Sequence, residues 1–166
     1  MDSSPPTPSA LVDRIVTATN RHDLDALVDC FAQDYVNETP VHPTRGFTGR
    51  EQVRRNWSQL FMAMPDLRCR VLARAVDGDD VWSQWEMRGT CHDGSLSQTA
   101  GVIVFTVVDG RAQRVRFFLE PVDTGTSTVD DAVAAAAGPA AAGPAAAGTA
   151  AAGTAAAATA AVGTAS

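Results

Sequence analysis

The stretch "MAMPDLRCRVLAR", residues 62–74, contains the point at which the spacing of apolar residues changes. Before Pro65 they recur at every third or fourth position, as on one face of an amphipathic helix that a proline would end. The stripe consists of Val53, Trp57, Phe61 and Met64. After Pro65 apolar and polar residues alternate, which is typical of a strand with one buried face. The chain is therefore predicted to place helices first and a sheet second.

Two further helices are predicted upstream of this one. Thr7 and Pro8 can cap and start a first helix that ends near Asn20. Asp23 is expected to cap a second, shorter helix. Its apolar face would consist of Leu24, Leu27, Val28 and Phe31. The segment "TGRE", residues 48–51, has the spacing of a capping box and predicts the start of the third helix.

Four segments after Pro65 have the character of strands. They are "LRCRVLAR" (67–74), "VWSQWEMRG" (81–89), "TAGVIVFTVV" (99–108) and "RVRFFLE" (114–120). The connections "DGDD", "HDGS" and "DGR" have the composition of hairpin turns. A short strand near Val36 is also compatible with the sequence. This order predicts an α+β fold, a cone-shaped α+β barrel with three N-terminal helices packed on a curved antiparallel sheet. The open end of such a cone is a natural small-molecule pocket.

The two ends of the chain differ from this central part. From Asp130 onward the sequence repeats AAAGP or AAAGT, where Gly, Pro and Thr recur too often for helical turns to propagate. We expect residues 125–166 to be a disordered tail, residues 1–8 to be flexible and residues 9–124 to form the domain. Residues 1–9 show no secretion signal, so a cytoplasmic protein is expected. Membrane insertion is not expected, because alanine is weakly apolar and the tract is interrupted.

Composition narrows the possible chemistry. All thirteen basic residues are arginine, so a Schiff base on lysine and a pyridoxal cofactor bound to this chain are excluded. The net charge of −6 does not suggest a nucleic-acid surface. The three histidines form no HxxxH pattern, and Cys30, Cys69 and Cys91 form no CxxC, so no metal site is predicted and free thiols are expected. No P-loop, GxSxG or Rossmann fingerprint is present, and we expect no cofactor.

Four stretches taken together resemble the SnoaL-like branch of the nuclear transport factor 2-like superfamily. They are "HDLDALVDCFAQDYVNETP" (22–40), "GREQVRRNWSQLFMAMPDLRCRVL" (49–72), "GDDVWSQWEMRGT" (78–90) and "FTVVDGRAQRVRFFLEP" (105–121). Their order and spacing over roughly residues 10–123 carry the resemblance. It implies the same cone-shaped fold. Enzymes of the superfamily include polyketide cyclases, ketosteroid isomerase and limonene-type epoxide hydrolases, and other members only bind.

The resemblance also suggests where chemistry would lie. The isomerase-type base falls in the loop "VNETP", at Glu38 or, one place along, at Thr39. The tyrosine of the isomerase is matched by Ile15, and its protonated aspartate falls near Ile103. The aspartate on the last long strand of the cyclases and epoxide hydrolases is matched by Phe117. Steroid isomerisation by the isomerase mechanism is therefore not expected.

Several polar residues remain candidates, each with a structural alternative. Glu38 would act as general base if it points into the pocket, or it is a solvated loop carboxylate. His42 is either a proton shuttle or part of a tight loop, and Asn37 either donates to a substrate carbonyl or caps a turn. Glu120 either faces the mouth of the pocket or, as is more common for a carboxylate at the end of a strand, forms a surface ion pair near Arg116. The remaining histidines, His22 and His92, are expected to be structural or in a surface turn, and Tyr35 to pack between the second helix and the sheet.

Large apolar residues would form both the core and the floor of the pocket. Those predicted to contact substrate are Trp57, Phe61, Trp85, Met87, Ile103, Phe105 and Phe117. The expected function is a cofactor-free pocket enzyme that catalyses cyclisation, isomerisation or ring-opening of an apolar, oxygenated, polyketide- or terpenoid-like molecule.

The same residues also allow two alternative functional interpretations, and they predict a homodimer. One reading is a non-catalytic binding or accessory protein of the same fold. The other is a vestigial fold in which Trp57 and Trp85 pack without a cavity. A homodimer is expected through the outer face of the sheet. That face would carry Trp82, Arg114, Arg116 and Phe118.

Overall fold

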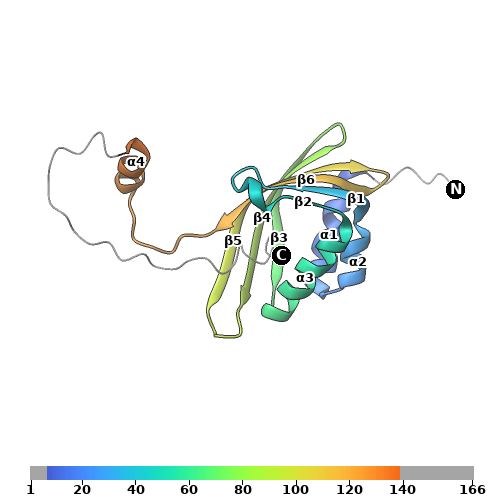
Figure 1. Cartoon of the computed structure of the whole chain (residues 1–166), viewed down its shortest axis with the longest axis horizontal. Helices are drawn as coiled ribbons and strands as arrows, with labels where there is room; N and C mark the ends of the chain where they lie inside the picture. Colours follow the sequence, from blue (N-terminus) through green and yellow to red (C-terminus); the bar gives the residue numbers. More distant parts are fainter. Residues whose placement is uncertain (1–6, 139–166) are drawn as a thin grey trace. The chain divides into compact units, whose positions relative to one another are not determined.

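Three helices precede the long strands, as the change of spacing at Pro65 predicts. The structure is a computed structural model that describes residues 7–138. The described chain divides after Val122 into two units. The first contains α1 (Pro8–Arg21), α2 (Leu24–Asp29), β1 (Phe31–Glu38), the 3₁₀ helix η1 (Pro43–Arg45), β2 (Phe47–Thr48), α3 (Arg50–Ala63), β3 (Arg68–Asp77), β4 (Asp80–Thr90), β5 (Leu96–Val108) and β6 (Arg111–Pro121) (Figure 1).

The strands form one six-stranded sheet in the order β2-β1-β6-β5-β4-β3. The expected α+β fold is confirmed, with two differences. β1 is a full strand rather than a short one near Val36, and it pairs with β6 in parallel, so the sheet is not wholly antiparallel. Phe31 begins this strand instead of closing the second helix. Phe31 and Tyr35 are four residues apart, which also suits a helix, and an irregular register between Phe31 and Val36 hides the alternation.

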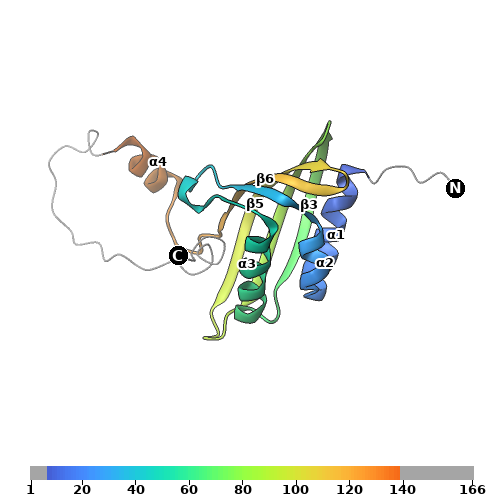
Figure 2. The same ribbon diagram turned by 45° about the vertical axis from the view of Figure 1, so that its right-hand side comes forward.

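The three helices α1, α2 and α3 lie against the concave face of the curved sheet (Figures 1 and 2). Side chains on this face alternate with outward ones. On β4 the inward set includes Val81, Ser83 and Trp85, all buried. The Trp85 indole Nε1 donates to Ser83 Oγ at 2.8 Å, and Ser83 Oγ donates to the Ile103 carbonyl at 2.9 Å. The buried polar side chains of Ser83 and Trp85 are thereby satisfied.

Gly101 lies on β5 where the backbone of β6 leaves no room for a side chain. It has a φ of +151°, and a Cβ built at this position would lie 2.1 Å from the Phe118 carbonyl oxygen. Only glycine fits such an approach, which is a common device for bending a sheet. Gly101 stands opposite Trp85 on β4 and Leu119 on β6. The missing side chain therefore lies in the same row as the large Trp85 ring.

Only some of the helix N-caps predicted from the sequence are present in the structure. Asp23 caps α2, because its carboxylate accepts a hydrogen bond from the Ala26 N–H at 3.0 Å, as predicted. Thr7 is the N-cap of α1, with Pro8 at its start, but its side chain makes no capping bond. The capping box predicted for "TGRE" is wrong. Gly49 is the N-cap of α3, and Thr48 belongs to β2, where it pairs with Val36.

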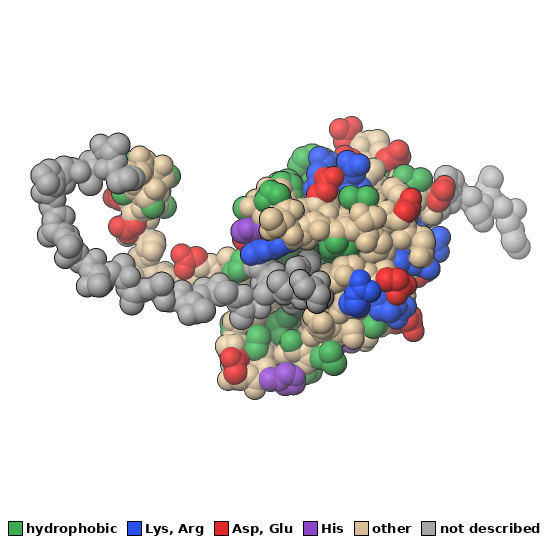
Figure 3. All heavy atoms as spheres, viewed as in Figure 1, with side chains coloured by type: hydrophobic (Ala, Val, Ile, Leu, Met, Phe, Trp, Pro, Cys, Tyr) green, Lys and Arg blue, Asp and Glu red, His purple; other side chains and the backbone are tan. Residues whose placement is uncertain are grey.

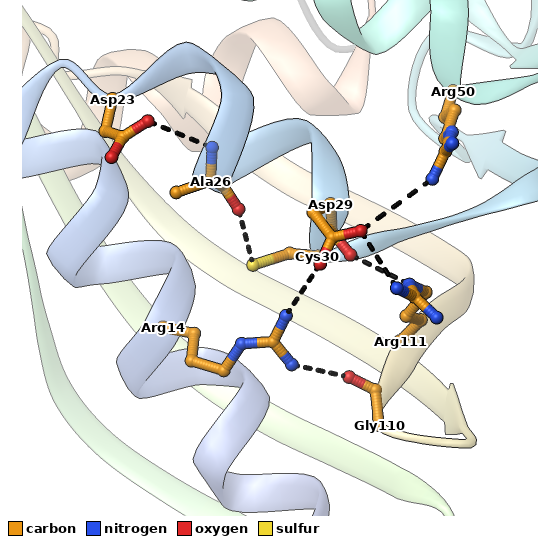
Figure 4. A network of polar contacts seen from close by, with 8 residues as sticks. All are labelled: Arg14, Asp23, Ala26, Asp29, Cys30, Arg50, Gly110 and Arg111. Carbon is orange, nitrogen blue, oxygen red and sulfur yellow. Dashed lines mark hydrogen bonds and ion pairs between the residues drawn. The ribbon is translucent and has the colours of Figure 1, made fainter.

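A group of charged residues joins α1, α2 and α3 to the start of β6 (Figure 4). The Asp29 carboxylate accepts a hydrogen bond from Arg111 at 2.9 Å and lies 3.8 Å from Arg14 and 4.0 Å from Arg50. The hydrogen bond from Arg111, with the positive charges around it, lowers the pKa of Asp29. Cys30, the next residue, is a buried thiol whose pKa is raised by burial.

The second unit contains α4 (Val129–Ala137). A capping box starts this helix: Thr128 Oγ1 accepts from the Asp131 N–H, and the Asp131 carboxylate accepts from the Thr128 N–H. These nine residues lie in the stretch for which the sequence predicts a disordered tail, and the cap with four consecutive alanines accounts for the difference. The rest of the predicted tail (139–166) and residues 1–6 lie outside the described residues.

Candidate functional site

A partly open cavity of about 110 Å³ lies between α3, β1, the concave face of the sheet and the loop Thr39–Gly46. Its walls are mainly apolar. They include Phe31, Trp57, Leu60, Met87, Phe117 and Leu119. An apolar protein cavity of about 150 Å³ is known to accept benzene. This one therefore suits a single ring or the leading end of a larger molecule, and its presence rules out the vestigial reading without a cavity.

Five of the ten residues predicted for the site line this cavity. They are Asn37, His42, Trp57, Met87 and Phe117. Three others, Trp85, Ile103 and Phe105, are buried in the core and do not line the cavity. Phe61 is turned toward α1 and stacks on the His22 ring with centroids 4.5 Å apart. Periodicity shows that these four side chains face inward, but it does not separate the cavity from the core.

Glu38 is the fifth residue that the structure does not bring into the cavity. In the pairing of β1 with β6, Asn37 stands opposite Val115 and Glu38 stands opposite Arg116. Adjacent strand residues face opposite sides, so an inward Asn37 requires an outward Glu38. The Glu38 carboxylate lies 3.5 Å from the Arg114 guanidinium on the outer side. This arrangement matches the alternative of a solvated carboxylate.

Asn37 presents an unused donor to the cavity. The residue is 2% exposed, and the Tyr35 hydroxyl donates a hydrogen bond to its Oδ1 at 3.1 Å. Burial raises the pKa of Tyr35 well above its ordinary value, so the phenol remains protonated and available as this donor. Among the described residues, Asn37 Nδ2 has no hydrogen-bond partner. The amide is thus oriented by Tyr35 and can donate to a ligand oxygen.

His42 and Glu120 form a pair at the edge of the cavity. His42 Nε2 lies 3.1 Å from a Glu120 carboxylate oxygen, and both side chains are partly exposed. The loop is held by Thr39, whose hydroxyl donates to the His42 carbonyl at 2.6 Å. The expected ion pair of Glu120 with Arg116 is not formed, because Arg116 pairs with Asp80 at 2.9 Å. β1 ends opposite Arg116, so the last residues of β6 have a free edge there, next to the loop.

Arg45 is a cavity residue that the sequence did not single out. It lies in η1, and its Nη1 is buried without a hydrogen-bond partner within residues 7–138. The only available signal was negative: the loop "TPVHPTRGFTG", residues 39–49, contains no acidic residue to pair with it. The other predicted polar positions behave as expected. The His22 ring bonds the Leu67 carbonyl, and the His92 ring bonds the Met62 carbonyl.

Most arginines of the domain form ion pairs with acidic side chains. On the face shown in Figure 3, acidic and basic side chains are intermixed among the described residues. Within residues 7–138, no three or more His, Cys, Asp or Glu side chains gather as metal ligands would. In the same part of the chain, no helix is long and apolar enough to cross a membrane.

Comparisons with known proteins agree with this fold. The model of the SnoaL-like domain family matches residues 12–115. A proposed polyketide cyclase of Sinorhizobium meliloti has 26% identity and a TM-score of 0.52, over 66% of this chain and 93% of that one. No curated protein sequence matches the chain.

Two other solved structures show the fold alone, because fewer than a quarter of their residues are identical. A proposed SnoaL-like polyketide cyclase of Jannaschia sp. CCS1 has 22% identity and a TM-score of 0.59, over 72% of this chain and 91% of that one. An epoxide hydrolase of Mycobacterium tuberculosis, described as similar to limonene epoxide hydrolase, has 17% identity and a TM-score of 0.60, over 68% and 82%.

Proposed function

Because the chain belongs to the SnoaL-like domain family, we propose that it is a cofactor-free pocket enzyme that acts on an apolar, oxygenated small molecule of polyketide or terpenoid type. The reaction would be a cyclisation or isomerisation that begins with proton removal next to a carbonyl group. One observation carries the proposal. The unpartnered Asn37 amide donor and the His42–Glu120 pair line the same apolar cavity.

The chemistry needs only these groups. The His42 imidazole takes a proton from the carbon next to the carbonyl, and the electrons of the broken C–H bond form an enolate. The enolate oxygen accepts a hydrogen bond from Asn37 Nδ2, and the Glu120 carboxylate stabilises the imidazolium. Return of the proton to another carbon completes an isomerisation. Attack of the enolate carbon on a second carbonyl of the same molecule, whose oxygen takes the proton back, completes a cyclisation. Ring-opening is not supported by a specific group.

The test uses α-tetralone, a bicyclic aryl ketone with one type of exchangeable C–H next to its carbonyl. We expect the protein to accelerate exchange of that hydrogen for deuterium in D₂O, followed by proton NMR, and His42→Gln to lose most of the acceleration. Glu38→Gln is the control, because its carboxylate faces the opposite side of the sheet. Exchange at the rate of buffer alone, or unchanged exchange in His42→Gln, would overturn the proposal.

A non-catalytic binding or accessory protein is the second candidate. The cavity supports it equally, and the sequence favours it at one point. The position that matches the aspartate of the cyclases is Phe117, which lines the cavity as an apolar wall. NMR shift changes at cavity residues upon addition of α-tetralone, with no accelerated exchange, would favour this function.

The homodimer expected from the sequence is also a proposal. The outer face carries Trp82, which is 46% exposed, and Phe118, which is 37% exposed. The Arg116 guanidinium lies 5.7 Å from the Trp82 ring centroid, so this aromatic and arginine surface is ordered before any partner arrives. Sedimentation equilibrium should show a dimer that Trp82→Glu converts to a monomer. A monomeric parent protein would end this proposal.

A further inference from the structure

Arg45 differs from Arg88, the second arginine that lines the cavity. Arg45 lines the cavity, and its Nη1 atom is shielded from solvent and has no hydrogen-bond partner among the described residues. A charged donor held away from water without a partner lowers the stability of the folded state. In native proteins such a group requires an explanation, and a ligand that supplies the missing partner is one.

Cationic side chains outnumber anionic ones among the residues that line the cavity, so one more negative charge would be balanced there. These side chains are Arg45, Arg88, His42 and Glu120. Glu120 is the only carboxylate among them and is already engaged by His42 at 3.1 Å. Arg88 is exposed and can be solvated, whereas the buried Nη1 of Arg45 cannot. Even with a neutral His42, two guanidinium groups face one carboxylate.

We propose that the ligand of this cavity carries a carboxylate group and that Arg45 binds it. A guanidinium offers paired N–H donors in a plane, which match the two oxygens of a carboxylate. The apolar walls would hold the hydrocarbon part of the ligand. Asn37 Nδ2, the second unpartnered donor, would remain for the carbonyl oxygen. A dianionic phosphate suits the site less well, because its second charge would face Glu120.

The inference rests on the cavity of the proposed function and specifies the substrate class as an aromatic or alicyclic carboxylic acid. The proposed catalysis by His42 and the proposed carboxylate binding by Arg45 can be disproved independently. Exchange of the uncharged α-tetralone depends on His42 and needs no carboxylate. The carboxylate preference is a binding measurement and needs no turnover.

The experiment compares a naphthalene carboxylate with the matching naphthalene carboxamide. Their dissociation constants would be measured from NMR shift changes of the full chain. The carboxylate should bind about tenfold more tightly than the carboxamide, and the preference should weaken as salt is added. Arg45→Met should remove the preference while keeping the volume of the side chain similar. Arg21→Gln is the control, because it removes the same charge from an exposed position on α1.

A second measurement separates ligand binding from a structural role. If Arg45 serves a ligand, Arg45→Met should leave the urea midpoint of the free protein unchanged or raise it, because a buried donor without a partner is removed. A lower midpoint would show that Arg45 supports the fold. Equal binding of the two compounds, no binding of the carboxylate at its solubility limit, or a preference that survives in Arg45→Met would each overturn the proposal.

Discussion

The concave and convex faces of the sheet are built from the same strands but do different things. On β4, Trp85 points inward and is 2% exposed, while Trp82 points outward and keeps 46% of its surface. The inner face holds the core and the cavity. The outer face is a mixture of arginine, acid and aromatic side chains that mostly pair with one another. Only the inner face therefore offers the low-dielectric surroundings that strengthen electrostatic interactions in catalysis.

Two glutamates sharpen the comparison, because they lie at the ends of the neighbouring strands β1 and β6 and have opposite surroundings. Glu38 lies on the outer face beside Arg114, and Glu120 reaches the cavity and His42. An outward carboxylate in water contributes little to catalysis, whereas a carboxylate that holds a histidine at a cavity edge can support proton transfer.

The largest expected effect is on turnover. Glu120→Gln should slow α-tetralone exchange by about 10²-fold, because the imidazolium formed on His42 loses its negative partner. Glu38→Gln should leave the rate unchanged. The rates would be measured by proton NMR in D₂O over a range of pH. A structural role for Glu120 would not alter the pH profile, whereas a role in supporting His42 should shift it. Equal rates in the two variants would remove the functional distinction between the faces.

The next effect is on stability. Trp85→Ala should lower the free energy of unfolding by about 3–5 kcal/mol, because it empties the core and leaves the Ser83 hydroxyl without its donor. Trp82→Ala should cost under about 1 kcal/mol in the monomer. Urea unfolding at several protein concentrations would separate this cost from any loss of dimer. Similar losses in both variants would mean that the outer face is as well packed as the inner one.

On β4 the alternation predicted the inner and outer faces correctly, because a regular period of two fixes the side of each residue in mid-strand. The inward Ser83 and Trp85 and the outward Trp82 follow it. On β3 the alternation holds only as far as the register shift between Val71 and Ala73.

Prediction failed at strand ends and in the loop. The sequence showed only a short strand near Val36, so it did not reveal that Glu38 shares a strand with an inward Asn37. Alternation along β6 predicts that Glu120 faces outward with Arg116 and Phe118. It lines the cavity instead, because β1 does not pair with this end of β6.

The cavity itself could not be obtained from periodicity. Trp57 and Phe61 lie on the same predicted stripe of α3, yet only Trp57 lines the cavity, because Phe61 is occupied by its stack on His22. The role of Arg45 depends on which acidic groups are near it in space. That no acidic group among the described residues pairs with the Arg45 Nη1 atom becomes visible only when the strands and helices are assembled.

The smallest expected effect comes from the charged group at Asp29, away from the cavity. Its carboxylate is held by Arg111 but is 55% exposed, so Asp29→Asn should lower the free energy of unfolding at neutral pH by under about 1 kcal/mol. The pKa of Asp29 is lowered by folding from its ordinary value of 3.8. The carboxylate thus stabilises the fold at pH values above 3.8, and this stabilisation disappears as pH falls through the lowered pKa. Urea unfolding of both proteins should show a gap at pH 7 that closes in acid and narrows with added salt. A gap that persisted in acid would show that the aspartate acts through packing or hydrogen bonding rather than through its charge.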